Sequence, residues 1–260
     1  MKKSLRRGII IGIISVSVCS ASFAATVIKR SDIQGKEEKI TLEKQHVRIQ
    51  GENANYYRLM DLKLKKVYQV DDKQKRILEM DIEGKPPKLP EGEPPPWFGQ
   101  EQAPVKAHLA KSEYVTDIAG YSSRYYQIMV LYQNKWRPCF DNYFSETAAK
   151  VPYLVDFINA LSQISQSRQI EGMPVHPCLQ ALDNLESEMK KLGVPMKTLI
   201  KGNKGDKVKH EILNIQTDVK VSPELFKVPD YHRITEQEKR EEVYKEMRKR
   251  MEEAQKRGYK

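Results

Sequence analysis

Short runs of apolar residues alternating with polar ones, separated by polar turns, fill residues 25–82 of the chain. A period of two is typical of β-strands, and polar turns such as residues 71–75 have the chemistry that a short hairpin needs. The pattern therefore predicts an antiparallel β-meander. Its six runs are ATVIKR, KITLEKQ, HVRIQG, YYRLMDL, KKVYQVD and RILEMDI.

The alternation stops at residues 85–104, a segment that holds seven prolines. Neither a helix nor a strand ladder tolerates that density of proline, so we expect a Pro-rich loop. Trp97 and Phe98 lie inside it. This aromatic pair either anchors the loop on the sheet or forms the tip of a lid over a hydrophobic cavity, and it supplies the ligand-lid candidates.

Three further strands are predicted between residues 105 and 140, because extended runs return there with short polar turns between them. In the middle run, SRYYQIMVLY, both faces are largely apolar. Such a strand belongs either to a sheet that packs a helix on one side and lines a pocket on the other, or to a fully buried sheet. The sequence leaves both interpretations open.

The apolar period changes from two to three and four after residue 146, which predicts two amphipathic helices. The first lies within residues 146–164 and has the stripe Leu154, Phe157, Ile158, Leu161 and Ile164. The second covers residues 179–192, ends at Gly193 as its C-cap, and has the stripe Leu179, Leu182, Leu185 and Met189. Residues 194–201 and 207–216 then predict a hairpin, followed by an extended segment with two prolines.

The last 26 residues, 235–260, are rich in charge. Thr235 and Glu238 form a capping box, and several acid-to-base pairs stand four residues apart. The apolar stripe is narrow, so we expect an exposed helical tail. This tail is either a solvated appendage or a helix that docks on a partner or a membrane surface.

The first 24 residues have the pattern of a secretory signal peptide. An apolar run over residues 8–19 is too short to span a bilayer comfortably and ends in small residues. We predict cleavage after Ala24 and a periplasmic or secreted mature chain. Cys19 does not suit a lipoprotein signal, because Val18 precedes it. Four basic residues begin the segment: Lys2, Lys3, Arg6 and Arg7.

Removal of this segment lowers the formal net charge from +10 to +6. A moderately basic surface can meet anionic lipid headgroups or simply keep the protein soluble. Nucleic acid is excluded as a partner for an exported chain, and the mature sequence has no second apolar stretch long enough for a membrane span.

Two cysteines remain in the mature chain, Cys139 and Cys178. An isolated pair in an oxidising compartment predicts a disulfide, and the spacing is not that of a CxxC redox motif. The bond would tether the end of a strand to the start of the second helix.

The motifs of common catalytic and metal sites are missing from the sequence. The five histidines form no HExxH or His/Cys cluster, no GxSxG elbow occurs, and residues 202–206 lack the spacing of a phosphate-binding loop. We therefore expect no enzyme, no cofactor and no catalytic or metal-binding residues.

Three segments carry a resemblance to a known family: RLMDLKLKKVYQVDDKQKRILEMDI, DIAGYSSRYYQI, and LGVPMKTLIK followed by SPELFKVPDYHRI. With them the chain resembles an uncharacterised exported-domain family of the lipoprotein-localisation-factor-like (LolA/LolB-like) superfamily. The chain departs from the family at Ser122 and Ser123, where a cysteine is often found after the AGY turn. The family's disulfide pattern is therefore not carried over.

The resemblance implies an α+β fold in which an open, curved antiparallel β-sheet, a half-barrel, has helices covering its concave face. Members that are understood hold acyl chains or lipid-modified proteins there. We thus expect a half-barrel domain over residues 25–234 and a non-enzymatic envelope binding protein for an acyl chain, a lipid or a lipidated protein. The alternative is an envelope interaction or assembly protein with a filled core, acting through the Pro-rich loop and the basic C-terminal helix.

Overall fold

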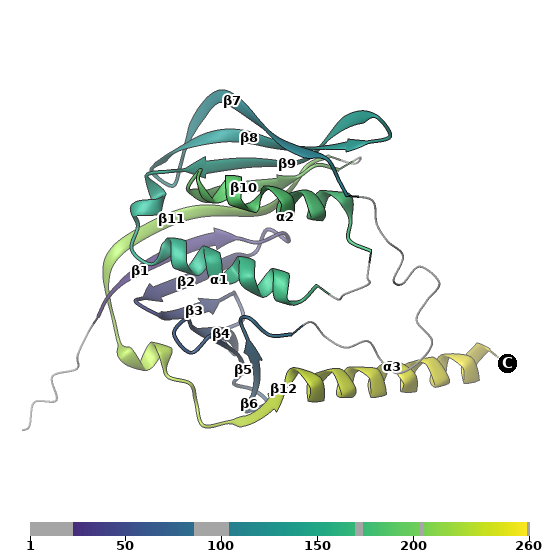
Figure 1. The fold of residues 1–260 in the computed structure, drawn as a ribbon. Helices are drawn as coiled ribbons and strands as arrows, with labels where there is room; N and C mark the ends of the chain where they lie inside the picture. The colour runs from purple at the N-terminus through teal and green to yellow at the C-terminus, as the bar shows by residue number, and fades with distance from the viewer. Residues whose placement is uncertain (1–22, 86–103, 170–173, 203–204, 259–260) are drawn as a thin grey trace, which may run out of the picture.

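A single curved sheet of twelve strands organises the chain in the computed structural model, which describes residues 23–85, 104–169, 174–202 and 205–258 (Figure 1). The strands are β1 (Phe23–Ser31), β2 (Glu37–Glu43), β3 (His46–Gln50), β4 (Tyr56–Asp61), β5 (Lys66–Asp71), β6 (Arg76–Asp81), β7 (Ala107–Ile118), β8 (Tyr121–Tyr132), β9 (Lys135–Ser145), β10 (Val194–Ile200), β11 (Lys207–Val221) and β12 (His232–Thr235). The helices are η1 (Ala148–Lys150), α1 (Leu154–Ser167), α2 (Pro177–Lys190), η2 (Pro223–Phe226) and α3 (Glu236–Gly258).

The strand order is β12-β6-β5-β4-β3-β2-β1-β11-β10-β9-β8-β7. Two meanders, β1 to β6 and β7 to β9, are joined through the hairpin β10–β11, because β11 pairs with β1. Every neighbouring pair is antiparallel except β12 and β6, which are parallel. The predicted meander and the open, curved α+β sheet are confirmed.

Helix α1 covers the concave face of the β1–β6 half (Figure 1). It begins at Leu154 rather than near residue 146, because residues 148–150 form a separate 3₁₀ turn and Pro152 cannot donate a helical hydrogen bond. Leu154, Phe157 and Ala160 are buried against the sheet, and Ile158, Leu161 and Ile164 pack around them.

Helix α2 covers the β7–β10 half and is tied to it by the disulfide Cys139–Cys178, with the two Cα atoms 5.5 Å apart. This confirms the predicted bond. The predicted apolar stripe is wrong at one end. Leu179 is 46% exposed, while Ala181 and Leu185 are buried, because the helix presents Cys178, Ala181 and Leu185 to the sheet and Leu179 to solvent.

The segment after β11 crosses to the convex face of the sheet. There Val228 and Tyr231 pack on the apolar residues of β4, β5 and β6, and Arg48 donates a hydrogen bond of 3.2 Å to the carbonyl oxygen of Leu225. The chain then returns to the sheet edge as β12. This half of the sheet is therefore covered on both faces.

Helix α3 follows directly and extends away from the sheet (Figure 1). Its capping box is confirmed: Glu238 accepts from the backbone N–H of Thr235 at 2.7 Å, and Thr235 accepts from that of Glu238 at 3.2 Å. Glu242 contacts Arg76 of β6 at 2.6 Å, and Glu236 lies 3.7 Å from Arg168, so its first two turns are fastened to the domain.

Two predictions fall at or beyond the limits of the described residues. Strand β1 begins at Phe23, two residues before the predicted start of the mature chain, and cleavage after Ala24 stays a prediction. Trp97 and Phe98 fall outside the described residues. In the part of the chain that is described, no helix is long and apolar enough to cross a membrane.

Candidate functional site on the concave face

Strand register orders the concave face into rows that run across β2 to β6. The row beneath α1 is entirely apolar: Leu42, Val47, Met60, Val67 and Met80. The next row mixes apolar and polar residues: Ile40, Ile49, Arg58, Gln69 and Leu78. The row beyond it is polar and includes Tyr56, Asp71 and Arg76. The face thus changes from apolar to charged within two rows.

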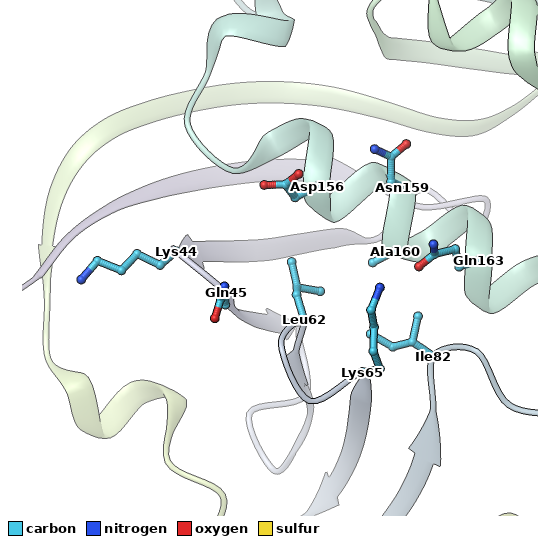
Figure 2. Close-up of a pocket in the computed structure, with 9 residues that line it drawn as sticks. All are labelled: Lys44, Gln45, Leu62, Lys65, Ile82, Asp156, Asn159, Ala160 and Gln163. Atoms are coloured by element: carbon cyan, nitrogen blue, oxygen red, sulfur yellow. The ribbon is translucent and has the colours of Figure 1, made fainter.

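An open cleft of about 320 Å³, here called the α1 cleft, runs along one flank of α1 (Figure 2). Leu62, Ile82 and Ala160 form its apolar part. Polar side chains from the helix and from the β2–β3 and β4–β5 turns form the rest: Lys44, Gln45, Lys65, Asp156, Asn159 and Gln163. Figure 2 shows Leu62 and Lys65 reaching from the β4–β5 turn towards the helix.

The layer between α1 and the sheet is filled by side chains. Phe157 and Leu154 are each 1% exposed, and the apolar row beneath them is buried with them. An apolar ligand can reach this layer only if α1 moves away from the sheet. Tyr153, in the left-handed conformation with φ 64°, stands immediately before the helix and marks where the chain turns into it.

A polar latch joins α1 to α2. Glu186 of α2 accepts hydrogen bonds from Ser162 at 2.7 Å and Gln166 at 2.8 Å, and Lys190 lies 2.9 Å from it. The hydrogen bond from Ser162, followed by that from Lys190, holds the pKa of Glu186 below its usual value. The carboxylate is therefore ionised near neutral pH and fastens the outer side of α1 to α2.

A second hollow, of about 540 Å³, lies where the concave face becomes polar. Arg58 lies 3.1 Å from Glu38, which also pairs with Arg30, and the Tyr56 hydroxyl donates to Gln69 at 2.7 Å. We call this hollow the arginine basin and define it by Lys36, Glu38, Ile49, Tyr56, Arg58 and Gln69. Ile49 also belongs to the apolar cluster under α1, so the basin adjoins that layer.

A polar cluster on the convex face has a structural role. Asp141 accepts hydrogen bonds from Tyr125 at 2.8 Å, Gln127 at 2.8 Å and Lys201 at 3.0 Å. Burial alone would raise the pKa of Asp141, but these donors outweigh it and lower the pKa. Burial and the hydrogen bond to Asp141 raise the pKa of Tyr125 to about 12. Neither group exchanges protons near neutral pH, so the cluster joins three strands and offers no acid–base chemistry.

His210 of β11 lies near Arg30, with its Nε2 atom 3.3 Å from the carbonyl oxygen of Pro195. Burial lowers the pKa of His210 to about 4, and the positive charge of Arg30 adds to the effect. The imidazole is therefore neutral in the folded protein over most of the physiological range.

Acidification is expected to destabilise the protein through His210. Above pH 6.5 the ring is neutral in both states; between pH 6.5 and about 4 only the unfolded chain takes up the proton. The free energy of unfolding should fall across this window by up to about 3 kcal/mol. Urea unfolding at pH 7.5 and pH 4.5 should show a smaller loss for His210→Gln than for the wild type. Equal losses would contradict the assignment, and the exposed His232→Gln serves as the control.

The paired cysteines could be identified from the sequence, but the charged residues of the concave face could not. Arg58 and Glu38 lie in different strands, and their contact exists only because β2, β3 and β4 pair in this register. One signal was present: in YYRLMDL an arginine shares a strand face with buried Met60. Among the described residues, no three His, Cys, Asp or Glu side chains group together as metal ligands.

Comparison with known proteins shows distant likeness only. No family model and no curated protein matches the chain. Among solved structures, it is similar to PNGF-II at 10% identity and TM-score 0.39, over 86% of this chain and 33% of that one. The chain therefore spans about a third of PNGF-II.

Two further solved structures match along most of their length. A LolA superfamily protein from Nitrosomonas europaea matches at 8% identity and TM-score 0.25, over 81% of this chain and 91% of that one. A putative outer membrane lipoprotein-sorting protein domain from Vibrio parahaemolyticus matches at 8% identity and TM-score 0.26, over 79% and 88%. The fold is defined by the strand order itself.

Proposed function

We propose that the protein is a non-enzymatic binding protein of the cell envelope that holds an acyl chain between α1 and the concave face of the sheet. The chain would belong to a lipid or to a lipidated protein. The observation that carries the proposal is the continuous apolar layer under α1, which borders the open α1 cleft on one flank and the arginine basin on the other.

The free energies of apolar burial favour displacement of α1 by an acyl chain. Lifting α1 exposes its fully buried side chains Leu154 and Phe157, which costs about 3 to 6 kcal/mol, while the acyl chain takes their place on the apolar row of the sheet. Burying an acyl chain of twelve carbons gains about 0.8 kcal/mol per methylene, close to 10 kcal/mol in all. A ligand of that length outweighs the cost of displacing the helix, whereas a chain of about four carbons does not.

Export to an oxidising compartment is consistent with this role. The disulfide Cys139–Cys178 is a bond that persists outside the cytosol, and the first 24 residues predict export. The bond fastens α2 covalently to the sheet, whereas α1 is held by packing and by the hydrogen bonds to Glu186. Of the two helices over the concave face, α1 is therefore the one that we expect to move.

The test loosens the latch on α1. Glu186→Ala removes the acceptor for Ser162 and Gln166, so the open state becomes more populated and the apparent affinity for a fluorescent fatty acid should rise about tenfold. Glu188→Ala, at an exposed position of the same helix, is the matched control and should bind like the wild type. Affinities come from fluorescence titration of the purified protein below the micelle concentration of the probe.

The proposal fails if wild type and Glu186→Ala both take up no fatty acid and mass spectrometry of the native protein finds no lipid. The alternative role, an envelope interaction protein with a filled core, would then rest on the exposed helix α3. A truncation before Val243 tests it, because it keeps the contacts of Glu236 and Glu242 with the domain. Loss of a co-purifying envelope protein from this variant would favour that role.

A further inference from the structure

We infer that the arginine basin binds the anionic headgroup, a carboxylate or a phosphate, of an amphiphile whose acyl chain lies under α1. The inference rests on the proposed function and narrows its ligand class: anionic single-chain amphiphiles should be preferred over neutral ones. It comes from the position, the charge and the exposure of Arg58, Arg30 and Lys36.

Arg58 lies directly beside the apolar layer under α1. Arg58 is the residue that follows Met60 on the concave face of β4, and its cross-strand neighbours are Ile49 and Gln69. Met60 and Ile49 belong to the apolar cluster that α1 covers. One step along the strand therefore leads from the layer that would hold a chain to a guanidinium group. An anionic amphiphile has the matching arrangement, an apolar chain directly followed by a charged headgroup.

The charge around Arg58 also favours an anion. Arg58 and Lys36 line the basin together with the acids Glu38 and Glu52. Arg30 does not line the hollow, but it pairs with Glu38, so this carboxylate is shared between two arginines and leaves Arg58 only partly neutralised. With Arg30 included, three positive charges face two negative ones, which favours an anionic headgroup over a neutral one.

The side chain of Arg58 is also accessible to a ligand, since it is 36% exposed. The side chain of Arg30 is 17% exposed, and its buried Nε atom has no hydrogen-bond partner in the described part of the chain. Arg58 therefore remains accessible while it contacts Glu38, and its planar group can offer further N–H donors to a carboxylate or phosphate. A buried ion pair sealed from solvent would lack this capacity.

The experiment compares three dodecyl probes below their micelle concentrations: dodecanoate, dodecyl phosphate and the neutral monolauroylglycerol. Calorimetry with the wild-type protein at pH 8 should give about tenfold tighter binding of the two anionic probes. Arg58→Gln should remove this preference and leave the affinity for monolauroylglycerol unchanged. Arg58→Lys, which retains the charge, should keep part of it.

Arg124→Gln is the matched control. Arg124 is 37% exposed, pairs with Glu113, and lies in β8, the last strand but one in the strand order and far from β4. This variant loses the same charge and should keep the preference for anionic probes. Thermal unfolding of both glutamine variants shows that each is folded when it is titrated.

The outcomes separate the inference from the proposed function. Equal binding of all three probes, unaffected by Arg58→Gln, overturns the inference and leaves acyl-chain binding in place. Binding of no probe overturns both. Inorganic phosphate that binds as tightly as dodecyl phosphate would show a site for a free anion, and the assignment to a lipid headgroup would be wrong.

Discussion

Replacing Cys139 and Cys178 together with alanine is expected to lower the free energy of unfolding by about 4 kcal/mol. The disulfide joins residues 39 apart in sequence, and closing a loop of that length removes much of the conformational entropy of the unfolded chain. Native-state strain would subtract from this value. Urea unfolding of the oxidised wild type and of the double variant measures the difference.

Reduced wild-type protein is the control for this prediction, since it loses the bond without losing the side chains. It should unfold at nearly the same urea concentration as the double variant. Hydrogen exchange should show where the loss is felt: amides of α2 should exchange faster, because the bond ends at its first turn, while those of α1 keep their protection. Identical stability of the reduced and oxidised proteins would contradict the loop-closure argument.

The local part of the fold could be predicted from the sequence. Runs such as KKVYQVD are short and apolar because Val67 packs under α1 while Tyr68 and Val70 pack under the C-terminal segment, and the polar turns between such runs require only neighbouring residues. The capping box at Thr235 and Glu238 is local in the same way. Such features depend on a few adjacent residues, so a single sequence contains them.

The order of strands could not be predicted in this way. Strand β1 pairs Phe23 with Val221, and β12 pairs His232 with Arg76, so both pairings join strands that lie more than half the chain apart in sequence. No local pattern encodes a partner so far away. The parallel pairing of β12 depends on the crossing of residues 222–231 over the convex face, which the sequence showed only as an extended segment.

The residues of the candidate site could not be predicted from local sequence patterns either. Leu179 fits a helical stripe by spacing, yet it is exposed, because the position of α2 on the sheet and not the period decides which side is covered. Arg58 looked like an ordinary polar position of a strand. Only the register places it beside Glu38 and above the apolar row. The ligand-lid candidates Trp97 and Phe98 remain predictions, since they lie outside the described residues.

Gly193 was singled out from the sequence, but the close contact that requires a glycine there appears only in the folded protein. It was expected as the C-cap of the second helix, but the C-cap is Lys191, and Gly193 has its positive φ of 98° two residues further along the chain. A Cβ atom at this position would also lie 2.3 Å from the backbone oxygen of Ser145. Ser145 pairs with Val194, the first residue of β10, so a side chain here would push β10 away from β9.

Gly193→Ala is therefore expected to lower the free energy of unfolding by about 3 to 4 kcal/mol, from backbone strain and overpacking together. Gly120→Ala separates the two causes. Gly120 has a similar φ of 83° but nothing within 4 Å of the added Cβ, so it should cost only about 1 kcal/mol. Urea unfolding of both variants measures the difference. Equal losses would mean that φ alone decides and that the backbone of β9 yields to the added atom; a larger loss at Gly193 would show that the close approach of β10 to Ser145 is what requires glycine.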